Sequence, residues 1–430
     1  MYKLFSVAVL ILILNTSCSL IKEQEVFNYD SYNISHNKFD FGFYEIPQSF
    51  AISKKCEIYI TGTTSKQDDP TDYLMIKMNK DLNLDNSFSQ EGKTMFDIDA
   101  GLDEGNQILL LNDQSFIIGG RSNHGVGLGM VLFDYSLAKF NSKGENIKSF
   151  GETGKVITDF GYRDDAINKM ILNKDGTFFA IGRANNGKDD DFAVAKYKPN
   201  GDLDYSFNKI GRVTIDFGLS DDVAYSAVKT EKGELIIGGS SNSGATPKVA
   251  FAKINAEGKL VDSFGQNGLK VWKFSPPGLI YDLDIIGQDI YASGFIDNLV
   301  NFNILVTKFD VDGIIDEDFG KRGTRIFSDI LTDSISTSLV VINENQILIA
   351  GTIKNDDNED ASLIMIDNKG NFDNSFADHG IYKLNYGKNE IFTDVIYFKN
   401  SLYSIGLHYD EDEGDVIVFK MHKNNISRCD

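Results

Sequence analysis

A segment centred on a phenylalanine recurs along this chain at an almost constant interval. Its clearest copy is GDLDYSFNKIG at 201–211, and successive copies are 62, 57, 57, 55 and 57 residues apart. The central residues of the six copies are Phe88, Phe150, Phe207, Phe264, Phe319 and Phe376. One period over most of 430 residues indicates a repeat architecture, in which each unit packs on its neighbours.

Each repeat unit predicts four β-strands. In the unit from 166 to 217, the β-rich segments are 166–174, 177–183, 191–199 and 212–217. The Asp175-Gly176 pair between the first two segments is the signal for a β-hairpin. No segment has a sustained apolar period of 3.6 residues, so we expect almost no helix.

Two strands of the unit carry a residue that recurs at a fixed place. The second strand has a glycine in seven copies, at Gly62, Gly120, Gly182, Gly239, Gly294, Gly351 and Gly406. A glycine inside a strand indicates close backbone approach, and we expect this approach where neighbouring repeat units crowd toward a central axis. The third strand has a lysine at Lys77, Lys139, Lys196, Lys253, Lys308 and Lys420. We expect each lysine to lay its stem on a neighbouring blade with its ammonium group in water.

These features predict an all-β chain, a seven-bladed β-propeller of four-stranded blades over residues 37–430. The crossover segment occurs six times and the second strand seven times, so one fourth strand is missing at the C-terminal end. Residues 37–42, NKFDFG, match the fourth-strand pattern RVTIDFG. We therefore expect this N-terminal strand to complete the last blade and remove the open edge.

Together, the G-x-L-D-x-S-F-G-x-x-G pattern, the D-F-G that follows a strand and the Asp-Gly hairpin resemble the delta-60 repeat of bacterial β-propellers. The resemblance covers about residues 37–423. It implies a secreted propeller of largely unknown function, and it implies no catalytic residues.

The N-terminus predicts export and lipid attachment. Lys3 precedes an apolar run from Leu4 to Leu14, and Thr16-Ser17-Cys18 follows. Residues 1–17 therefore read as a signal peptide, with an apolar run too short for a membrane span. The segment is similar to the lipobox of bacterial lipoproteins, except that Asn15 stands where an aliphatic residue is usual. The similarity implies that Cys18 is lipidated; the alternative is ordinary signal cleavage with an incidental cysteine.

The predicted location is the bacterial cell envelope, with the protein lipid-anchored and either periplasmic or on the cell surface. Residues 18–36 are polar without a clear period, and we interpret them as the lipidated N-terminus and a tether. We expect a monomer that touches the membrane through its anchor.

The net charge of −21 argues against nucleic acid as a partner and against membrane binding driven by charge. Many acidic residues lie in loops that a propeller places on one face, including Asp72, Asp415, Asp103, Asp165 and Asp222. The candidate metal ligands are Asp189, Asp190, Asp191, Asp356, Asp357, Asp410 and Asp412. Ca²⁺ favours several oxygen ligands in one place, so we expect weak Ca²⁺ binding if any, and no other cofactor. The alternative is a solvated acidic surface.

Two cysteines remain once Cys18 is assigned to the anchor. Cys56 and Cys429 fall in the first and last blades, on the face opposite the acidic loops. Outside the cytoplasm such a pair can oxidise, and a disulfide here would clasp the ring. Two free thiols are the alternative.

For function, the sequence favours a non-enzymatic binding or scaffold module that uses one face to hold a protein or glycan ligand. The five histidines lack metal-site spacing, and no G-x-S-x-G segment is present. We predict no catalytic residue. The alternative is a glycan-active hydrolase or lyase with a site at the mouth of the central channel.

Overall fold

Every regular element of the described structure is a β-strand. The computed structural model describes residues 32–65, 71–99, 101–123, 132–161, 164–218, 220–242, 247–272, 274, 276–328, 331, 333–355, 358–410 and 413–423. These residues form twenty-eight strands and no helix, so none of them belongs to a helix that could cross a membrane. The predicted all-β class is confirmed.

The strands pair mainly with their neighbours in sequence. Five sheets contain four consecutive strands each. These strands are β6 (Asp103–Leu110), β7 (Phe116–Asn123), β8 (Phe133–Phe140), β9 (Lys155–Thr158), β10 (Ala166–Leu172), β11 (Phe178–Asn185), β12 (Asp190–Tyr197), β13 (Arg212–Ile215), β14 (Asp222–Lys229), β15 (Leu235–Ser241), β16 (Lys248–Ile254), β17 (Leu269–Trp272), β18 (Gly278–Ile286), β19 (Asp289–Asp297), β20 (Phe302–Asp310), β21 (Thr324–Ile326), β22 (Ser334–Asn343), β23 (Gln346–Lys354), β24 (Glu359–Ile366) and β25 (Ile381–Leu384).

A further sheet joins the two ends of the described chain. It has eight strands in the order β26-β27-β28-β2-β3-β4-β5, with β1 paired to β28. These strands are β1 (Tyr32–Phe39), β2 (Tyr44–Ile52), β3 (Ile58–Ser65), β4 (Asp72–Met78), β5 (Lys93–Phe96), β26 (Asn389–Phe398), β27 (Ser401–Tyr409) and β28 (Gly414–Lys423).

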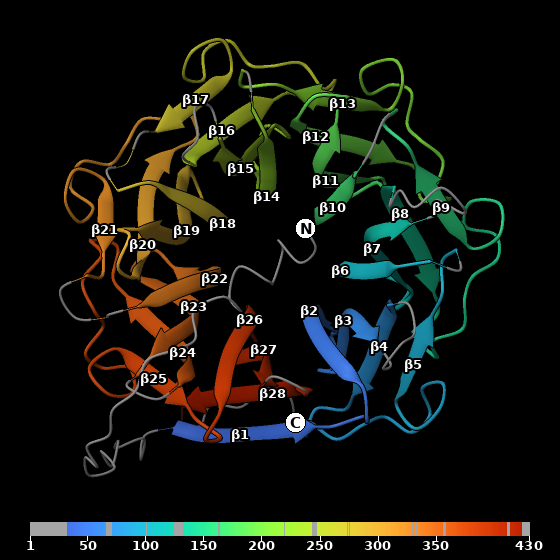
Figure 1. Cartoon of the computed structure of the whole chain (residues 1–430), viewed down its shortest axis with the longest axis horizontal. Coiled ribbons are helices and arrows are strands. Elements are labelled where there is room, and N and C mark those ends of the chain that lie inside the picture. Colours follow the sequence, from blue (N-terminus) through green and yellow to red (C-terminus); the bar gives the residue numbers. More distant parts are fainter. Residues whose placement is uncertain are drawn as a thin grey trace.

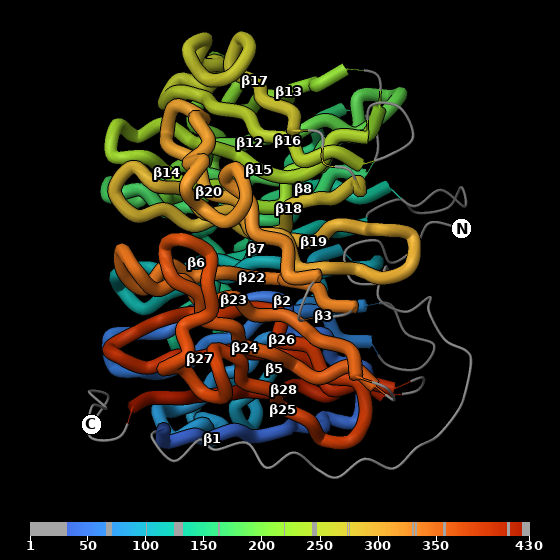
Figure 2. The backbone as a smooth tube through the Cα atoms, turned by 90° about the vertical axis from the view of Figure 1, so that its left-hand side faces the viewer, coloured from blue at the N-terminus to red at the C-terminus, as the bar shows by residue number. Residues whose placement is uncertain are grey.

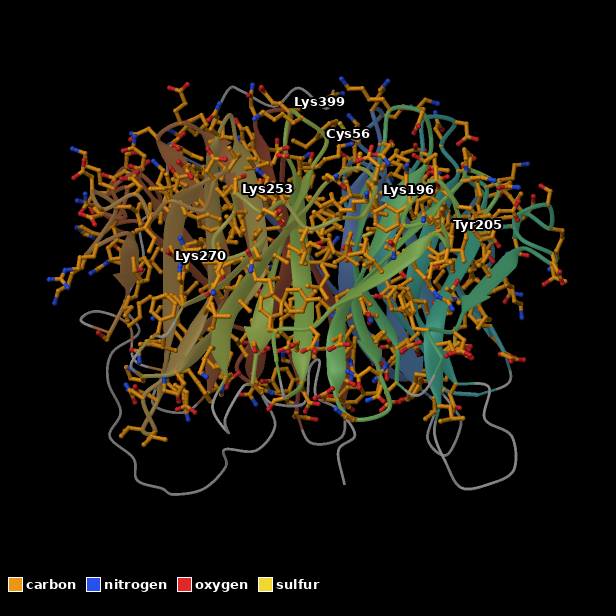
Figure 3. The ribbon with its side chains drawn as sticks, turned by 90° about the horizontal axis from the view of Figure 1, so that it is seen from above. Cys56, Lys196, Tyr205, Lys253, Lys270 and Lys399 are labelled. Carbon is orange, nitrogen blue, oxygen red and sulfur yellow. The ribbon has the colours of Figure 1, made fainter. Side chains whose placement is uncertain are left out.

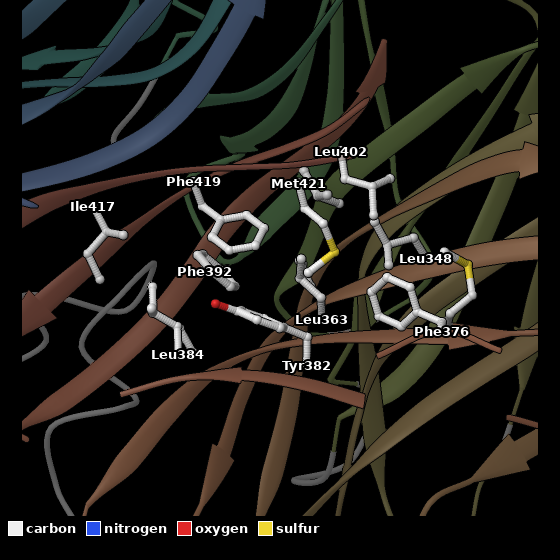
Figure 4. Packing of buried hydrophobic residues seen from close by; sticks show 14 residues of the cluster. Leu348, Leu363, Phe376, Tyr382, Leu384, Phe392, Leu402, Ile417, Phe419 and Met421 are labelled. Carbon is white, nitrogen blue, oxygen red and sulfur yellow. The ribbon is translucent and has the colours of Figure 1, made fainter. Parts of the chain in front are cut away.

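The sheets stand around a common centre, with β2, β6, β10, β14, β18, β22 and β26 innermost (Figure 1). In the side view, the strands run between two edges of the molecule, and these edges are formed by loops (Figure 2). Buried apolar side chains fill the space between neighbouring sheets. One cluster joins Leu348 of β23 and Phe376, which lies between β24 and β25, to Phe392 and Phe419 of β26 and β28 (Figure 4). The core is therefore divided into layers that lie between sheets.

The recurring phenylalanine holds neighbouring repeats together. Phe207 is 0% exposed and contacts residues of both the β10–β13 and the β14–β17 sheets. Gly258, which opens the next copy of the motif, has a φ of +80°, and a Cβ there would lie 2.9 Å from the Phe207 ring. Gly144 meets Phe88 and Gly313 meets Phe264 in the same way. The spacing of the motif is thus set by a contact between one repeat and the next.

The N-terminal strand pairs with the last strand of the chain, as the sequence predicts. β1 runs antiparallel to β28, with Asn37 opposite Val418 and Phe39 opposite Val416. The strand begins at Tyr32, before residue 37, where we expected the repeat region to start, and residues 40–43 form the turn into β2.

The glycines of the second strand have a different cause from the one predicted. In every sheet the innermost strand has a β-bulge opposite this glycine, for example between Ala224 and Ser226 opposite Gly239. A Cβ on Gly239 would lie 1.9 Å from the carbonyl oxygen of Val223, and the other six glycines meet a backbone oxygen at 1.8–2.2 Å. The close approach is therefore made within one sheet, at a bulge, rather than between crowded blades.

The third-strand lysines also differ from the prediction. Lys77 is 5% exposed, and its Nζ lies 3.0 Å from Glu57 Oε1 and 2.9 Å from Asp85 Oδ2. Lys308 has similar carboxylate partners in Asp289 and Asp316, at 2.9 and 2.7 Å. For Lys77 and Lys308 the expectation that the ammonium group lies in water is wrong, because a desolvated charge needs a paired partner.

Candidate functional site

A short turn links the outermost strand of one sheet to the innermost strand of the next. In Asp216-Phe217-Gly218, the Gly218 N–H donates to Asp216 Oδ1 at 2.6 Å, and the Phe217 N–H donates to Asp222 Oδ2 at 2.8 Å. The Phe217 ring packs on Phe192, with ring centroids 4.8 Å apart. The D-F-G sequence therefore fixes two carboxylates, Asp216 after β13 and Asp222 at the start of β14.

A third carboxylate joins them from the start of the third strand. Asp191 in β12, Asp216 and Asp222 each offer one oxygen, and these oxygens all lie within 4.8 Å of one another. The same three positions form acidic triads at three other junctions of the described structure. These triads are Asp40, Glu45 and Asp415; Asp72, Asp97 and Asp103; and Asp134, Asp159 and Asp165.

All four triads lie at one edge of the molecule. Glu45 is near the start of β2, whereas Cys56 lies in the turn beyond the end of the same strand, at the opposite edge. Each triad takes one residue from the start of a third strand, one from the turn after the outermost strand, and one at or just before the start of the innermost strand that follows. The triads are therefore junctions between sheets as well as features of one face.

The innermost member of each triad is buried, and several triad oxygens lack a partner. Glu45, Asp103 and Asp222 are each 0% exposed. Glu45 Oε2, Asp103 Oδ1, Asp191 Oδ1 and Asp222 Oδ1 are buried without a hydrogen-bond partner. A buried acceptor without a partner is costly, and such groups are uncommon in folded proteins.

Burial and mutual repulsion raise the pKa values of these carboxyl groups. Burial, together with the neighbouring charges of Asp191 and Asp216, raises the pKa of Asp222 to about 6, although hydrogen bonds from Ser241 and the Phe217 N–H oppose the rise. The same causes raise the pKa of Asp103 to about 6 and the pKa values of Asp165 and Glu45 to about 7. In each case the other two members of the triad supply the repulsion.

Of the metal candidates chosen from the sequence, the described structure places only Asp191 in a triad. Asp190 binds the Arg183 guanidinium, and Asp410 accepts a hydrogen bond from Lys388. Asp189 Oδ1 accepts from Asn186 Nδ2 at 2.6 Å. Asp356, Asp357 and Asp412 lie outside the described residues.

Sequence reasoning missed the grouping of the triads. Asp103, Asp165 and Asp222 were expected on the acidic face, but their partners at the D-F-G turns were not singled out. Aligning the repeats on the strand glycine would have put acidic residues at three fixed positions.

The cysteines can be followed only in part. Cys56 is 1% exposed and disulfide-bonded, and its partner lies outside the described residues, as do Cys18 and Cys429. The Lys399 Nζ donates to the Lys54 carbonyl at 2.8 Å, so the hairpins after β2 and after β26 are neighbours at this edge (Figure 3). The pairing of Cys56 with Cys429 stays a prediction.

The innermost strands bring a second group of charged residues together. Lys169 Nζ lies 3.2 Å from Asp282 Oδ1, and Ser226 and Ser338 donate to Asp282 at 2.7 and 2.9 Å. Ser338 also donates to Asp394 Oδ1 at 3.1 Å. These groups come from strands far apart in the sequence and bind one another in a polar network.

Comparisons with known proteins agree on the fold. The family model "domain of unknown function (DUF5122) beta-propeller" matches residues 173–207. No curated protein matches the sequence.

Several solved structures are similar over most of the chain. The polysaccharide lyase Uly1 has 11% identity, a TM-score of 0.51, and coverage of 87% of this chain and 89% of its own. A PL25 ulvan lyase has 10% identity and a TM-score of 0.49, covering 89% of this chain and 95% of its own. Sqt1 of Chaetomium thermophilum has 9% identity and a TM-score of 0.48, covering 89% and 96%. The sheet arrangement, the partial family match and the likeness to Uly1 together show a β-propeller.

Proposed function

We propose that this β-propeller is a lipid-anchored protein of the bacterial cell envelope and a non-enzymatic binding or scaffold module that uses its acidic face. The observation that carries this proposal is the gathering of four carboxylate triads at one edge of the described structure. A strongly negative face attracts and orients cationic partners. The ligand is therefore proposed to present positive charge, as a basic protein segment or an amino-bearing glycan does.

The proposed architecture has seven blades. The eight-stranded sheet is held between β28 and β2 by a single parallel bridge, Tyr44 to Gly414. Dividing it there gives two sets of four strands, β26-β27-β28-β1 and β2–β5. In support, an apolar cluster containing Phe50, Tyr403 and Val416 lies between these two sets, as such clusters lie between the other sheets. This count is the one that the seven copies of the strand glycine suggest.

The proposed anchor is Cys18. Its support is the sequence alone, an apolar run that ends in Thr-Ser-Cys. Residues 1–31 lie outside the described part of the chain. Cells that express wild type or Cys18→Ala would be labelled with a radioactive fatty acid. We expect label on the wild type alone, and equal labelling of both proteins would refute the anchor.

A glycan-active hydrolase or lyase is the alternative. Its natural location is the central channel, where Lys169, Asp282 and Asp394 meet. These groups are engaged with one another and with Ser226 and Ser338, which favours a structural network over a reactive site. The likeness to Uly1 concerns the fold.

The binding role is tested by capture from native envelope material with the purified mature chain. Asp189→Asn with Glu413→Gln removes two charges from the acidic edge outside the triads, and Asp202→Asn with Glu257→Gln removes two from the opposite edge. We expect the first variant, and added salt, to weaken capture, while the second variant captures as wild type does. Equal capture by both variants would refute binding through this face, and release of new reducing or unsaturated sugar ends would support the enzyme.

A further inference from the structure

We infer that the acidic triads are divalent-cation sites that link neighbouring blades, with Ca²⁺ as the cation whose chemistry fits best. The site with the most complete set of ligands is the triad of Asp191, Asp216 and Asp222. This inference rests on the fold and on the triad geometry, and it does not depend on any partner of the acidic face.

The ligand atoms match a hard cation. Three carboxylate oxygens within 4.8 Å of one another come from two sheets, Asp191 and Asp216 from one and Asp222 from the next. A set made only of oxygens suits Ca²⁺, Mg²⁺ or Mn²⁺, and Ca²⁺ tolerates irregular geometry best. An ion bound here would join the outer part of one blade to the innermost strand of the next.

The unpartnered oxygens point to a missing ligand. Asp222 is 0% and Asp191 4% exposed, yet Oδ1 of each lacks a hydrogen-bond partner. Their second oxygens are occupied, by the Phe217 N–H and by the Asn186 side chain at 3.0 Å. Asp191 is thus held in position by one oxygen while its Oδ1 has no donor. Asp222 is held by the Phe217 N–H, and the Ser241 hydroxyl also interacts with this carboxylate and lowers its pKa. A bound cation would supply what these atoms lack and would offset the repulsion between the charges.

The triads differ in how well they are equipped. Glu45 and Asp103 each present one buried oxygen without a partner, as Asp222 does. In contrast, Asp165 has both oxygens occupied, by the Phe160 N–H at 2.8 Å and the Asn185 N–H at 3.1 Å. We therefore expect the triad of Asp134, Asp159 and Asp165 to bind most weakly.

Other junctions of the same chain show that the fold itself does not require these acids. Register places Lys248 and Gly278 where the best triad has Asp191 and Asp222. At the following junction the equivalent residues are Asn303 and Ser334. Both junctions keep the same strand pairing without a carboxylate at these positions. The acids at the four triads therefore call for a role beyond strand pairing.

Ca²⁺ binding to the triads is tested on the mature chain after a chelator has removed any bound ion. Native mass spectrometry would count bound ions as Ca²⁺ is added, and calorimetry would give their affinity. We expect up to four ions per chain, with dissociation constants of about 10⁻⁴ to 10⁻³ M as in extracellular modules, and a melting temperature that rises with Ca²⁺. Mg²⁺ should bind more weakly, because it demands stricter geometry.

Single substitutions assign the ions to the triads. Asp216→Asn changes an exposed member and leaves the buried core intact, so it should fold and bind one ion fewer than wild type. Asp222→Asn tests the buried member. Asp202→Asn is the control, because this aspartate lies after β12, at the edge opposite the triads, and should keep the full count.

Two results would overturn the inference. One is wild-type protein that binds no Ca²⁺ at millimolar concentration and melts at the same temperature with and without it. The other is a folded Asp216→Asn variant with the ion count and affinities of wild type. Neither result would bear on capture of an envelope partner, because the capture variants lie outside the triads.

Discussion

Replacing Phe207 with alanine should be among the most destabilising single changes in this chain. The ring is 0% exposed and packs edge-on against Phe179, with centroids 5.6 Å apart and an interplanar angle of 67°. It also packs against Gly258 of the following repeat, where an added Cβ would lie only 2.9 Å from the ring. Truncation would therefore open a cavity between two sheets rather than at the surface.

The size of the effect follows from complete burial. A fully buried phenylalanine replaced by alanine typically costs about 3–5 kcal/mol, through lost transfer free energy and the cavity left behind. The space around the ring is bounded by two repeats, by Phe179 of β11 on one side and by Gly258 in the loop between β16 and β17 on the other. The total stability of a folded domain is about 5–15 kcal/mol, so the loss would be a large fraction of it.

Equilibrium unfolding in urea would measure the change, with fluorescence and circular dichroism followed together. Tyr205→Ala is the control, because this side chain is 64% exposed and lies two residues away. Its effect should stay within about 0.5 kcal/mol. A Phe207→Ala midpoint within experimental error of the Tyr205→Ala midpoint, at equal slopes, would refute the view that this phenylalanine joins the repeats.

Three further predictions concern closure, ion pairing and the disulfide. Deleting residues 32–39 removes the strand opposite β28 and should lower the melting temperature by several degrees, since about 1 kcal/mol shifts it by a few degrees; a change under about 2 °C would contradict this. The hydrogen bond from Lys308 lowers the pKa of Asp316, so the folded form binds fewer protons than the unfolded one near pH 4 and stability falls as pH drops through the folded pKa. The stability difference between wild type and Asp316→Asn should therefore be largest above about pH 4 and shrink below it; a difference that is the same at all pH values would exclude the pair as its source. Unreduced mature protein should show no titratable thiol at Cys56 or Cys429 after denaturation, and two thiols would rule out the clasp, which a chain-entropy model credits with upwards of about 4 kcal/mol.

Local patterns in the sequence determined the architecture of the unit. The Asp175-Gly176 hairpin, the buried apolar strands and the constant interval between phenylalanines each depend on residues a few positions apart, or on one repeat copied many times. The match of NKFDFG to the fourth strand even predicted which strand pairs with β28, although Phe39 and Val416 are 377 residues apart. That prediction succeeded because counting the repeats shows that the last unit lacks its fourth strand, and residues 37–42 match that strand.

Tertiary structure decided the features that depend on what lies opposite a residue. The strand glycine was found in all seven copies, but its reason is a bulge in the paired strand, which no period within one strand reveals. The Lys308 ammonium group is likewise explained by Asp289, at the start of β19, and Asp316, in the loop after β20. Asp216 and Asp222 follow Asp191 by 25 and 31 residues along the chain, yet one oxygen of each of the three lies within 4.8 Å of the others. An acidic loop and a carboxylate triad have the same composition, and only the packing of one sheet against the next buries the charges and brings them together.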